Sequence, residues 1–343
     1  RTLEAYGKHY TVGFPHEEYA SGRPRIISPL YERLKDHRAV IGSKLGWERP
    51  NWFAPQGMEQ HDIYSMGHQN WFAPVAKEHA LVRDSAGIFD QSSFAKYELA
   101  GPGAAAALDW ICANNVTRGP GRLTYTQMLN SRGGLECDLT VAQLAEDHFY
   151  IVTGTGFRTH DASWIRDHMP QDCDATLTDV TEQWGTLSLM GPRARDVLSK
   201  VTDHDVSNQA FSFGHVRDIE IAGHIVRALR VTYVGELGWE LHVPIAATGD
   251  VFDALMAAGA EFGVRPVGYR AIESLRLEKG YRAWSSDITP NDTPFEAGLG
   301  WAVKLKSDVD FVGRAACERV ANQRLTKKLA CFTVDDAGVV LLG

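Results

Sequence analysis

Three short runs between residues 120 and 155 constrain the fold most, because they alternate apolar and polar residues and are separated by tight turns. The runs are LTYTQML, LECDLTVAQL and FYIVTG, and NSRGG and AEDH join them. A period of two with glycine or acidic turns predicts antiparallel strands connected as a meander. Asp138 and Thr140 then point away from the face of Leu139 and need solvent or a partner. If the second and third runs pair, Tyr150 lies on the side of Asp138.

Strand-like runs and helical patterns alternate along the rest of the chain. Helical spacing appears in VAKEHALVRDSAG, which Gly87 would end, in GDVFDALMAAGAEFG, and in GYRAIESLRLEKG. Strands are predicted in WGTLSLM and on both sides of a glycine turn in HIVRALRVTYVGELGWELHVP. These elements fall into two blocks of similar size, residues 76–180 and 181–300. The pattern is typical of the α+β class, with sheets and helices segregated.

The stretch YVGELGWELHVP, from Tyr233 to Pro244, allows two interpretations. Alternation places Trp239 on one face of a strand, and Glu240 and His242 on the other. In the first interpretation this is a surface strand with its polar face in water. In the second, the carboxylate of Glu240 points into a pocket, and the glycines let a ligand approach the backbone.

Composition excludes several classes of protein. The 343 residues carry a formal net charge of −8, which argues against nucleic acid as the partner. No apolar run is long enough to span a bilayer, so no membrane partner is expected. The five cysteines are scattered and form no C-x-x-C pair, which argues against disulfide and zinc frameworks and favours a reducing compartment. We expect a cytoplasmic location, or the mitochondrial matrix if the source is eukaryotic.

The two ends of the chain read as cut. The chain starts at Arg1 without a signal-peptide pattern, and KKLACFTVDDAGVVLLG reads as a strand, a turn at residues 335–338 and the start of a second strand. We therefore expect a fragment. Residues 1–75 contain GWERPNWFAP and a second NWFAP, and we interpret their aromatic residues as anchors that pack a connector onto a larger body.

Familiar catalytic motifs are missing from the sequence. It has no phosphate-binding loop, no G-x-G-x-x-G and no G-x-S-x-G elbow. What remains is a set of strand carboxylates, a helix arginine and several aromatic residues, which suits a planar polar heterocycle. A carboxylate can accept two parallel hydrogen bonds from an amidine-like edge such as that of an aminopterin.

Five stretches in order resemble one family over essentially the whole chain. They are LNSRGGLECDLTV, YVGELGWELHVP, GYRAIESLRLEKGYRAW, TPFEAGLGWAVKLK and FVGRAA. Their order and spacing are similar to those of the aminomethyltransferase (T-protein) of the glycine cleavage system, and more similar to its relatives fused behind a flavin oxidase, the sarcosine and dimethylglycine dehydrogenases. The resemblance implies two similar lobes of antiparallel sheet and helices around a central folate pocket, with a truncated C-terminal barrel. The expected domains are a connector at 1–75, a tetrahydrofolate-binding domain at 76–315 and the start of the barrel at 316–343.

The resemblance also implies roles for single residues. Asp138 matches the aspartate that the family places beside N10 of tetrahydrofolate and is the expected catalytic residue. Glu240 matches the residue on the aminopyrimidine edge of the pterin. The other expected folate-binding residues are Thr140, Tyr150, Tyr233, Arg270 and Trp301.

Two departures from the T-protein pattern bear on the function. Phe94 of FDQSSF stands where the T-proteins have a methionine, which resembles the dehydrogenase branch. No flavin-binding motif is present. The resemblance thus implies the folate-binding part of a sarcosine- or dimethylglycine-dehydrogenase-type oxidoreductase. FAD would be held by a domain in cis, and the partners would be tetrahydrofolate and a methylamine. The one-carbon unit would be captured as 5,10-methylenetetrahydrofolate.

Two alternatives stay open at this stage. One is a folate-dependent aminomethyltransferase or demethylase that works without flavin. The other is a non-catalytic regulatory homologue, similar to the regulator of pyruvate dehydrogenase phosphatase.

Overall fold

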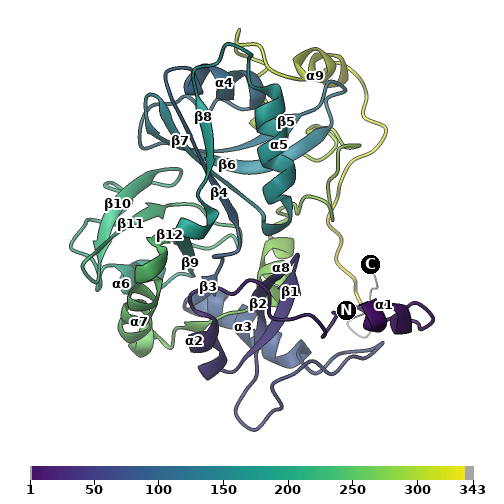
Figure 1. Ribbon diagram of the computed structural model, residues 1–343, viewed down its shortest axis with the longest axis vertical. Helices are drawn as coiled ribbons and strands as arrows, with labels where there is room; N and C mark the ends of the chain where they lie inside the picture. Colours follow the sequence, from purple (N-terminus) through teal and green to yellow (C-terminus); the bar gives the residue numbers. More distant parts are fainter. Residues whose placement is uncertain (1, 337–343) are drawn as a thin grey trace.

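The computed structural model describes residues 2–336, and within them the chain forms three sheets with helices packed around them (Figure 1). The α-helices are α1 (Thr2–Lys8), α2 (Tyr31–Asp36), α3 (Phe72–Asp84), α4 (Ala104–Ile111), α5 (Arg158–His168), α6 (Ala194–Leu198), α7 (Thr248–Gly259), α8 (Tyr269–Glu278) and α9 (Arg314–Ala321). The strands are β1 (Ala39–Lys44), β2 (Trp47–Phe53), β3 (Gly87–Asp90), β4 (Ala95–Ala100), β5 (Leu123–Leu129), β6 (Leu135–Ala145), β7 (His148–Thr153), β8 (Thr176–Asp179), β9 (Trp184–Met190), β10 (Val216–Ile221), β11 (His224–Leu229), β12 (Gly238–Pro244) and β13 (Arg265–Pro266). Antiparallel pairing prevails and helices cover the sheets, so the α+β prediction is confirmed.

The predicted meander forms one side of a five-stranded antiparallel sheet with the order β5-β6-β7-β4-β8. Leu139 and its neighbours on one face of β6 pack with α4 and α5 in a buried apolar cluster. Asp138 and Thr140 therefore lie on the opposite face, as the alternation predicts.

A six-stranded sheet with the order β10-β11-β12-β9-β3-β13 forms the second lobe. Trp239, Leu241 and Val243 of β12 pack with residues of α6 and α7 in the largest apolar cluster. Because side chains alternate, Glu240 and His242 lie on the face that turns away from these helices.

The Asp138 face of β6 and the Glu240 face of β12 belong to the sides on which the two sheets contact each other. One buried cluster joins Ala142 and Tyr150 of the five-stranded sheet to Val216 and Leu229 of the other. The Tyr150 hydroxyl lies 2.9 Å from Nδ1 of His242, which links β7 directly to β12. This contact region between the two sheets positions the candidate site.

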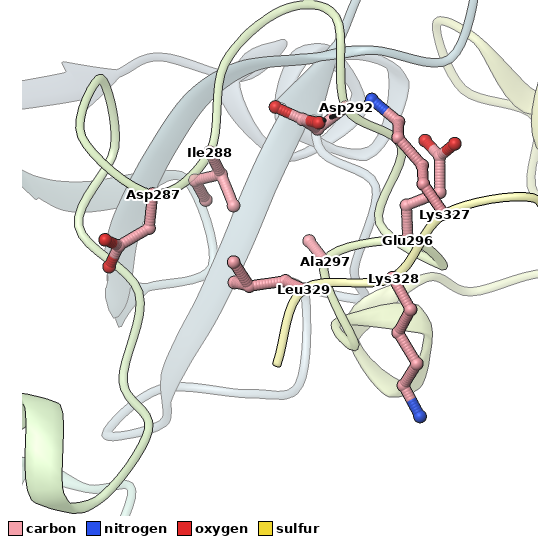
Figure 2. Close-up of a pocket in the computed structure, with 8 residues that line it drawn as sticks. All are labelled: Asp287, Ile288, Asp292, Glu296, Ala297, Lys327, Lys328 and Leu329. Atoms are coloured by element: carbon pink, nitrogen blue, oxygen red, sulfur yellow. Dashed lines mark hydrogen bonds and ion pairs between the residues drawn. The ribbon is translucent and has the colours of Figure 1, made fainter. Parts of the chain in front are cut away.

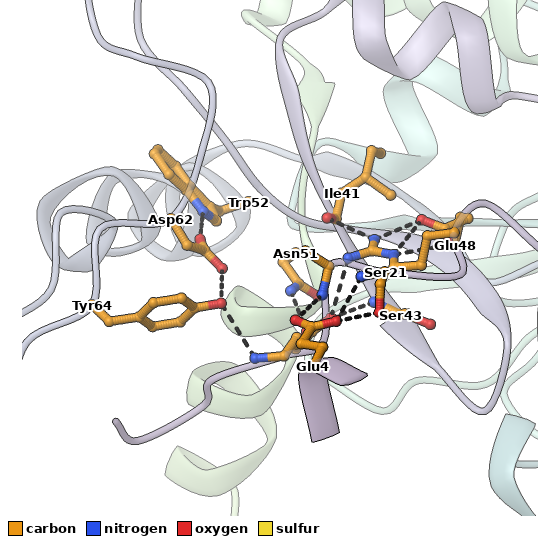
Figure 3. A network of polar contacts seen from close by, with 12 residues as sticks. Glu4, Ser21, Ile41, Ser43, Glu48, Asn51, Trp52, Asp62 and Tyr64 are labelled. Atoms are coloured by element: carbon orange, nitrogen blue, oxygen red, sulfur yellow. Dashed lines mark hydrogen bonds and ion pairs between the residues drawn. The ribbon is translucent and has the colours of Figure 1, made fainter. Parts of the chain in front are cut away.

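The β1–β2 hairpin and the loop after it pack on α3 and α8. Trp52 is fully buried and Trp71 nearly so, and they share one apolar cluster with Val40 and Ala54. Their role as anchors of a connector on a larger body stays a prediction. Asp62 accepts a hydrogen bond from Trp52 Nε1 at 2.7 Å and lies beside Tyr64 (Figure 3). The segment before Ser28 is mostly exposed.

Two predicted element bounds differ from the structure. The strand expected from Tyr233 begins only at Gly238, because the Thr232 side chain accepts hydrogen bonds from the backbone N–H groups of Val234 and Gly235 and holds a turn there. Gly87 does not end α3, which ends at Asp84; it is the first residue of β3. A Cβ at this glycine would lie 2.5 Å from Val267 Cγ2, so close packing explains the residue.

The strand expected near the C-terminus is not formed within the described residues. Leu329 N donates to Glu296 O at 2.9 Å, and Lys327 lies 2.8 Å from Asp292, but this segment pairs with no described strand. These residues surround a cavity of about 210 Å³ (Figure 2). A lone extended segment without a pairing partner does not form a sheet. The turn expected at 335–338 lies partly outside the described residues. Among the described helices, none has the length and apolar character needed to cross a bilayer.

Candidate functional site

Asp138 lies partly buried on β6, on the face between the two sheets. Gln127 of β5 stands directly opposite it, and Gln127 Nε2 donates to Asp138 Oδ1 at 3.0 Å. Burial raises the pKa of Asp138 to about 6, while hydrogen bonds from Gln127 and the Tyr125 hydroxyl hold it from rising further. A carboxyl with this pKa is divided between its two protonation states near neutral pH, as a general acid or base must be.

Aromatic side chains stand around Asp138. Burial is the main cause that raises the pKa of Tyr233, and the charge of Asp138 contributes, so the two groups are close. The Tyr233 hydroxyl donates to Arg282 O at 3.0 Å. Trp301 is largely exposed, with its ring centroid 6.0 Å from that of Tyr125. These rings form walls with one side open to solvent.

Thr140 lies on the same face, two residues along β6 from Asp138. It stands opposite Tyr125 on β5 and Val152 on β7. The structure thus brings the expected residues Asp138, Thr140, Tyr233 and Trp301 into one region.

Glu240 is buried on β12, where it stands opposite Ser188 of β9 and Leu229 of β11. Its carboxylate makes no hydrogen bond within the described residues. Burial raises its pKa to about 7, against the attraction of the Lys96 charge. The interpretation as a surface strand is therefore wrong, because the five-stranded sheet covers the polar face of β12.

Lys96 of β4 is a site residue that the sequence analysis missed. Its ammonium group donates to the backbone oxygens of Ser92, Phe94 and Trp184 at 2.9, 3.0 and 3.1 Å. In its charged form Lys96 uses all three N–H groups in these bonds, so it offers Glu240 charge but no hydrogen bond. Burial lowers the pKa of Lys96 to about 7, so this charge is partial near neutral pH. A single lysine inside a strand gives no sequence signal of such a role. Gln127 was missed because its position opposite Asp138 depends on strand register.

Two expected folate-binding residues have partners elsewhere in the structure. The Tyr150 side chain is fully buried and its hydroxyl is bound to His242. The Arg270 guanidinium pairs with both carboxylate oxygens of Asp62 at 2.8 Å and lies 3.5 Å from the ring centroid of Trp71. Direct contact of Tyr150 or Arg270 with a folate stays a prediction.

One group of possible metal ligands lies behind β6. Donor atoms of Cys137, His160 and Asp161 are within 4.8 Å of one another. Burial raises the pKa of the Cys137 thiol well above its usual range, so the thiol is neutral. Asp161 already accepts hydrogen bonds from Thr153 and His160 at 2.6 and 2.9 Å. Both carboxylate oxygens of Asp161 and Nδ1 of His160 are thus already engaged in hydrogen bonds within the chain.

Unpaired polar atoms between the sheets indicate what the site accepts. Gln127 Oε1 and His242 Nε2 are buried without a hydrogen-bond partner in the described part of the chain, and the Glu240 carboxylate has no polar contact there closer than the 3.8 Å to His242 Nε2. Buried polar groups are normally satisfied, so these three groups are candidates for contact with a ligand. Two of the three groups are acceptors, which fits a ligand that carries N–H donors.

Comparisons with known proteins agree with this geometry. The GCVT N-terminal domain family matches residues 30–307. Human sarcosine dehydrogenase, mitochondrial, is 41% identical over 98% of this chain and 41% of that protein. Mouse dimethylglycine dehydrogenase, mitochondrial, is 36% identical over 97% of this chain and 38% of that protein. The chain thus spans about two fifths of the length of these relatives.

A solved structure resembles the fold as well. The glycine cleavage system aminomethyltransferase T from Bartonella henselae superposes with a TM-score of 0.73 and 27% sequence identity, over 87% of this chain and 75% of that one.

Proposed function

The chain belongs to the GCVT N-terminal domain family, and on this basis we propose that it binds tetrahydrofolate and transfers a one-carbon unit to it. The proposed site is the space between the two sheets, where Asp138 of β6 and Glu240 of β12 face each other's sheet.

The unpaired carboxylate of Glu240 is the observation that carries this proposal. A buried carboxylate without a hydrogen bond is costly unless a ligand supplies donors. The aminopyrimidine edge of a pterin presents two parallel N–H groups, which a carboxylate accepts side by side. Its pKa of about 7 lets Glu240 ionise near neutral pH when such donors are present.

We assign the other groups by their chemistry. Bound tetrahydrofolate supplies nucleophilic amine nitrogens that take up the one-carbon unit. Asp138 holds or moves the proton of the reacting nitrogen, as its intermediate pKa favours. The aromatic rings of Tyr233 and Trp301 provide flat walls. Thr140, on the same face of β6 as Asp138, offers a hydroxyl.

The product and the source of the carbon follow from the resemblance to the dehydrogenases. We propose that an FAD-bearing half in cis oxidises sarcosine, dimethylglycine or a similar methylamine, and that this chain captures the carbon as 5,10-methylenetetrahydrofolate. The hydride of the methyl group would pass to FAD. The iminium carbon would then bond to the two folate nitrogens as its bond to the amine nitrogen breaks, and the protons lost by the folate nitrogens would pass through Asp138 to the departing amine. As in the two relatives named as mitochondrial, we propose a matrix location if the source is eukaryotic.

Titration calorimetry with tetrahydrofolate tests the proposal. Glu240→Gln keeps the shape of the side chain but loses a charge-assisted pair, so affinity falls at least about tenfold. Glu220→Gln is the matched control, because Glu220 lies exposed on β10 of the same sheet. Unchanged affinity in a folded Glu240→Gln variant would remove Glu240 from the site, and with it the main support for folate binding there.

A further inference from the structure

We propose that His242 is a positioning residue for Glu240: its neutral imidazole donates Nε2–H to the Glu240 carboxylate, and Tyr150 fixes the required tautomer from the other ring nitrogen. This inference rests on the proposed role of Glu240 in folate binding. In this arrangement Tyr150 affects the ligand indirectly, through His242 and Glu240, and needs no direct contact with the folate.

The geometry around His242 supports this arrangement. The side chain is fully buried on β12, on the same face as Glu240. Nδ1 lies 2.9 Å from the Tyr150 hydroxyl and 3.3 Å from Thr186 Oγ1. Nε2 has no hydrogen-bond partner in the described residues, and it lies 3.8 Å from Glu240 Oε2. A small rotation of the carboxylate closes this separation to hydrogen-bonding distance.

The hydroxyl of Tyr150 determines the tautomer. Burial raises the pKa of Tyr150 well above its usual range, so the phenol keeps its proton. Nδ1 of His242 is the acceptor within reach of that proton. A neutral imidazole has one N–H, so when Nδ1 accepts, the proton of the ring is on Nε2.

The imidazole stays neutral because of its surroundings. Burial lowers the pKa of His242 well below its usual range, and the charges of Lys96 and Arg227 lower it further. Arg227 of β11 stands directly opposite His242 in the sheet. A neutral donor beside Glu240 adds a hydrogen bond without placing a second cation next to Lys96.

Other donors near Glu240 are already engaged. The three N–H groups of Lys96 are bound to backbone oxygens. Ser188, which stands opposite Glu240 on β9, has its hydroxyl bound to Gln91 Oε1. Among the described residues, two buried donors on this face have no hydrogen-bond partner, His242 Nε2 and Arg227 Nε. Of these, His242 Nε2 is the one within 4 Å of the Glu240 carboxylate, so it is placed to orient that group.

The proposed hydrogen bond from His242 affects both the ionisation and the orientation of the Glu240 carboxylate. A hydrogen bond to the ionised form of Glu240 favours that form. It also fixes the plane of the carboxylate, so that the opposite edge is directed at the incoming donors. Loss of Nε2–H then weakens folate binding most where Glu240 is close to being protonated.

Nitrogen-15 NMR of the chain labelled at histidine tests the tautomer without any ligand. We expect the His242 proton on Nε2 from pH 5.5 to pH 8.5, and partial transfer to Nδ1 in Tyr150→Phe. A proton on Nδ1 in the unaltered chain, or a charged imidazolium in this pH range, would overturn the inference.

Tetrahydrofolate affinity measured against pH tests the effect on Glu240. His242→Phe fills the buried space without a donor, and we expect affinity about tenfold lower at pH 6.5 and nearly normal at pH 8.5. The charged and titratable groups around the pair are Lys96 on β4, which acts on both Glu240 and His242, Arg227 on β11, which acts on His242, and Tyr150 on β7, which contacts His242. An equal loss at both pH values would indicate a packing role and contradict the inference.

A double variant separates this inference from the proposed function. Because His242 acts through Glu240, His242→Phe should cause no further loss of affinity in a Glu240→Gln background. Fully additive losses would overturn the inference and leave the folate site intact. No loss in Glu240→Gln alone would overturn the proposed function, while NMR would still decide the tautomer.

A control variant and a substitute variant accompany His242→Phe. His224→Phe on β11 of the same sheet is the control, because His224 pairs with Asp250 at the surface and should have no effect. If His242→Phe does not fold, Tyr150→Phe replaces it: we expect the same dependence on pH with about a threefold loss at pH 6.5. A Tyr150→Phe affinity that matches the unaltered chain at pH 6.5 would count against the inference.

Discussion

Asp138 and Glu240 lie on the facing sheets and both have a raised pKa, but their surroundings differ. Asp138 is partly exposed and is held by Gln127 and Tyr125, which moderate its pKa. Glu240 is deeper, has no hydrogen bond and keeps only the distant attraction of Lys96. The first arrangement suits a group that exchanges protons with a substrate. The second suits a group that waits for donors from a ligand, so environment assigns the two roles.

The largest expected effect separates catalysis at Asp138 from binding at Glu240. Asp138→Asn keeps size and removes charge, so formation of methylenetetrahydrofolate from tetrahydrofolate and formaldehyde slows by roughly 10²–10⁴-fold. Affinity for tetrahydrofolate should change less than about twofold, because Glu240 and the aromatic walls remain. Stopped-flow rates with the uncatalysed reaction subtracted, beside calorimetry, measure both.

Asp147→Asn is the control for this comparison, since Asp147 lies in the exposed turn between β6 and β7. If Asp138→Asn lowers affinity as much as rate, the two carboxylates do not differ in role and the assignment of Asp138 is wrong.

The next effect concerns stability and pH. The pKa of Glu240 in the folded chain is about 7, above the usual 4.5 of a glutamate, so the protonated side chain stabilises the fold at low pH and this contribution is lost as pH rises towards and through 7. Glu240→Gln should match the unaltered chain at pH 4.5 and exceed its free energy of unfolding by on the order of 3 kcal/mol at pH 8.

Urea unfolding without folate at the two pH values measures this difference, with Glu220→Gln as the exposed control. A variant that is less stable at pH 8 would mean that groups beyond the hydrogen bond proposed from His242 stabilise the ionised form of Glu240, and the contrast with Asp138 would disappear.

The smallest effect concerns the open side of the site. Trp301 is 70% exposed and contacts Tyr125 at the edge, so Trp301→Ala should weaken tetrahydrofolate binding by only about two- to fivefold. Equilibrium titration followed by fluorescence of the remaining tryptophans measures the change. A loss larger than that of Glu240→Gln would place the main binding energy at the edge instead of between the sheets.

The local sequence pattern predicted the meander correctly but could not decide whether Glu240 on β12 is buried. The runs at 123–129 and 135–145 are strands with the predicted faces, because alternation and glycine turns act within a few residues. The burial of Glu240 depends on a sheet formed by residues about a hundred positions earlier. An alternating strand looks the same whether water or a second sheet covers its polar face.

The same limit applies to the helix arginine and the final segment. Arg270 pairs with Asp62, which is 208 positions away, and no spacing rule connects the two. The segment near Leu329 has strand-like composition but lacks a strand to pair with among the described residues. Family resemblance supplied the candidate residues. The hydrogen bonds of Lys96, and the absence of one at Glu240 among the described residues, could be recognised only in the folded structure.

The pairing of Asp62 with Arg270 has a consequence for proteolysis. The connection from Phe53 to Phe72 contains no helix or strand, and Asp62 fastens it near its midpoint to α8 and to Trp52. Halving a loop changes its closure entropy by only about 0.6 kcal/mol, so the gain in global stability is small. Local opening is affected more, because a protease needs an extended stretch that the fastened loop cannot release. A single carboxylate far from the candidate site therefore sets how readily this connection is cut.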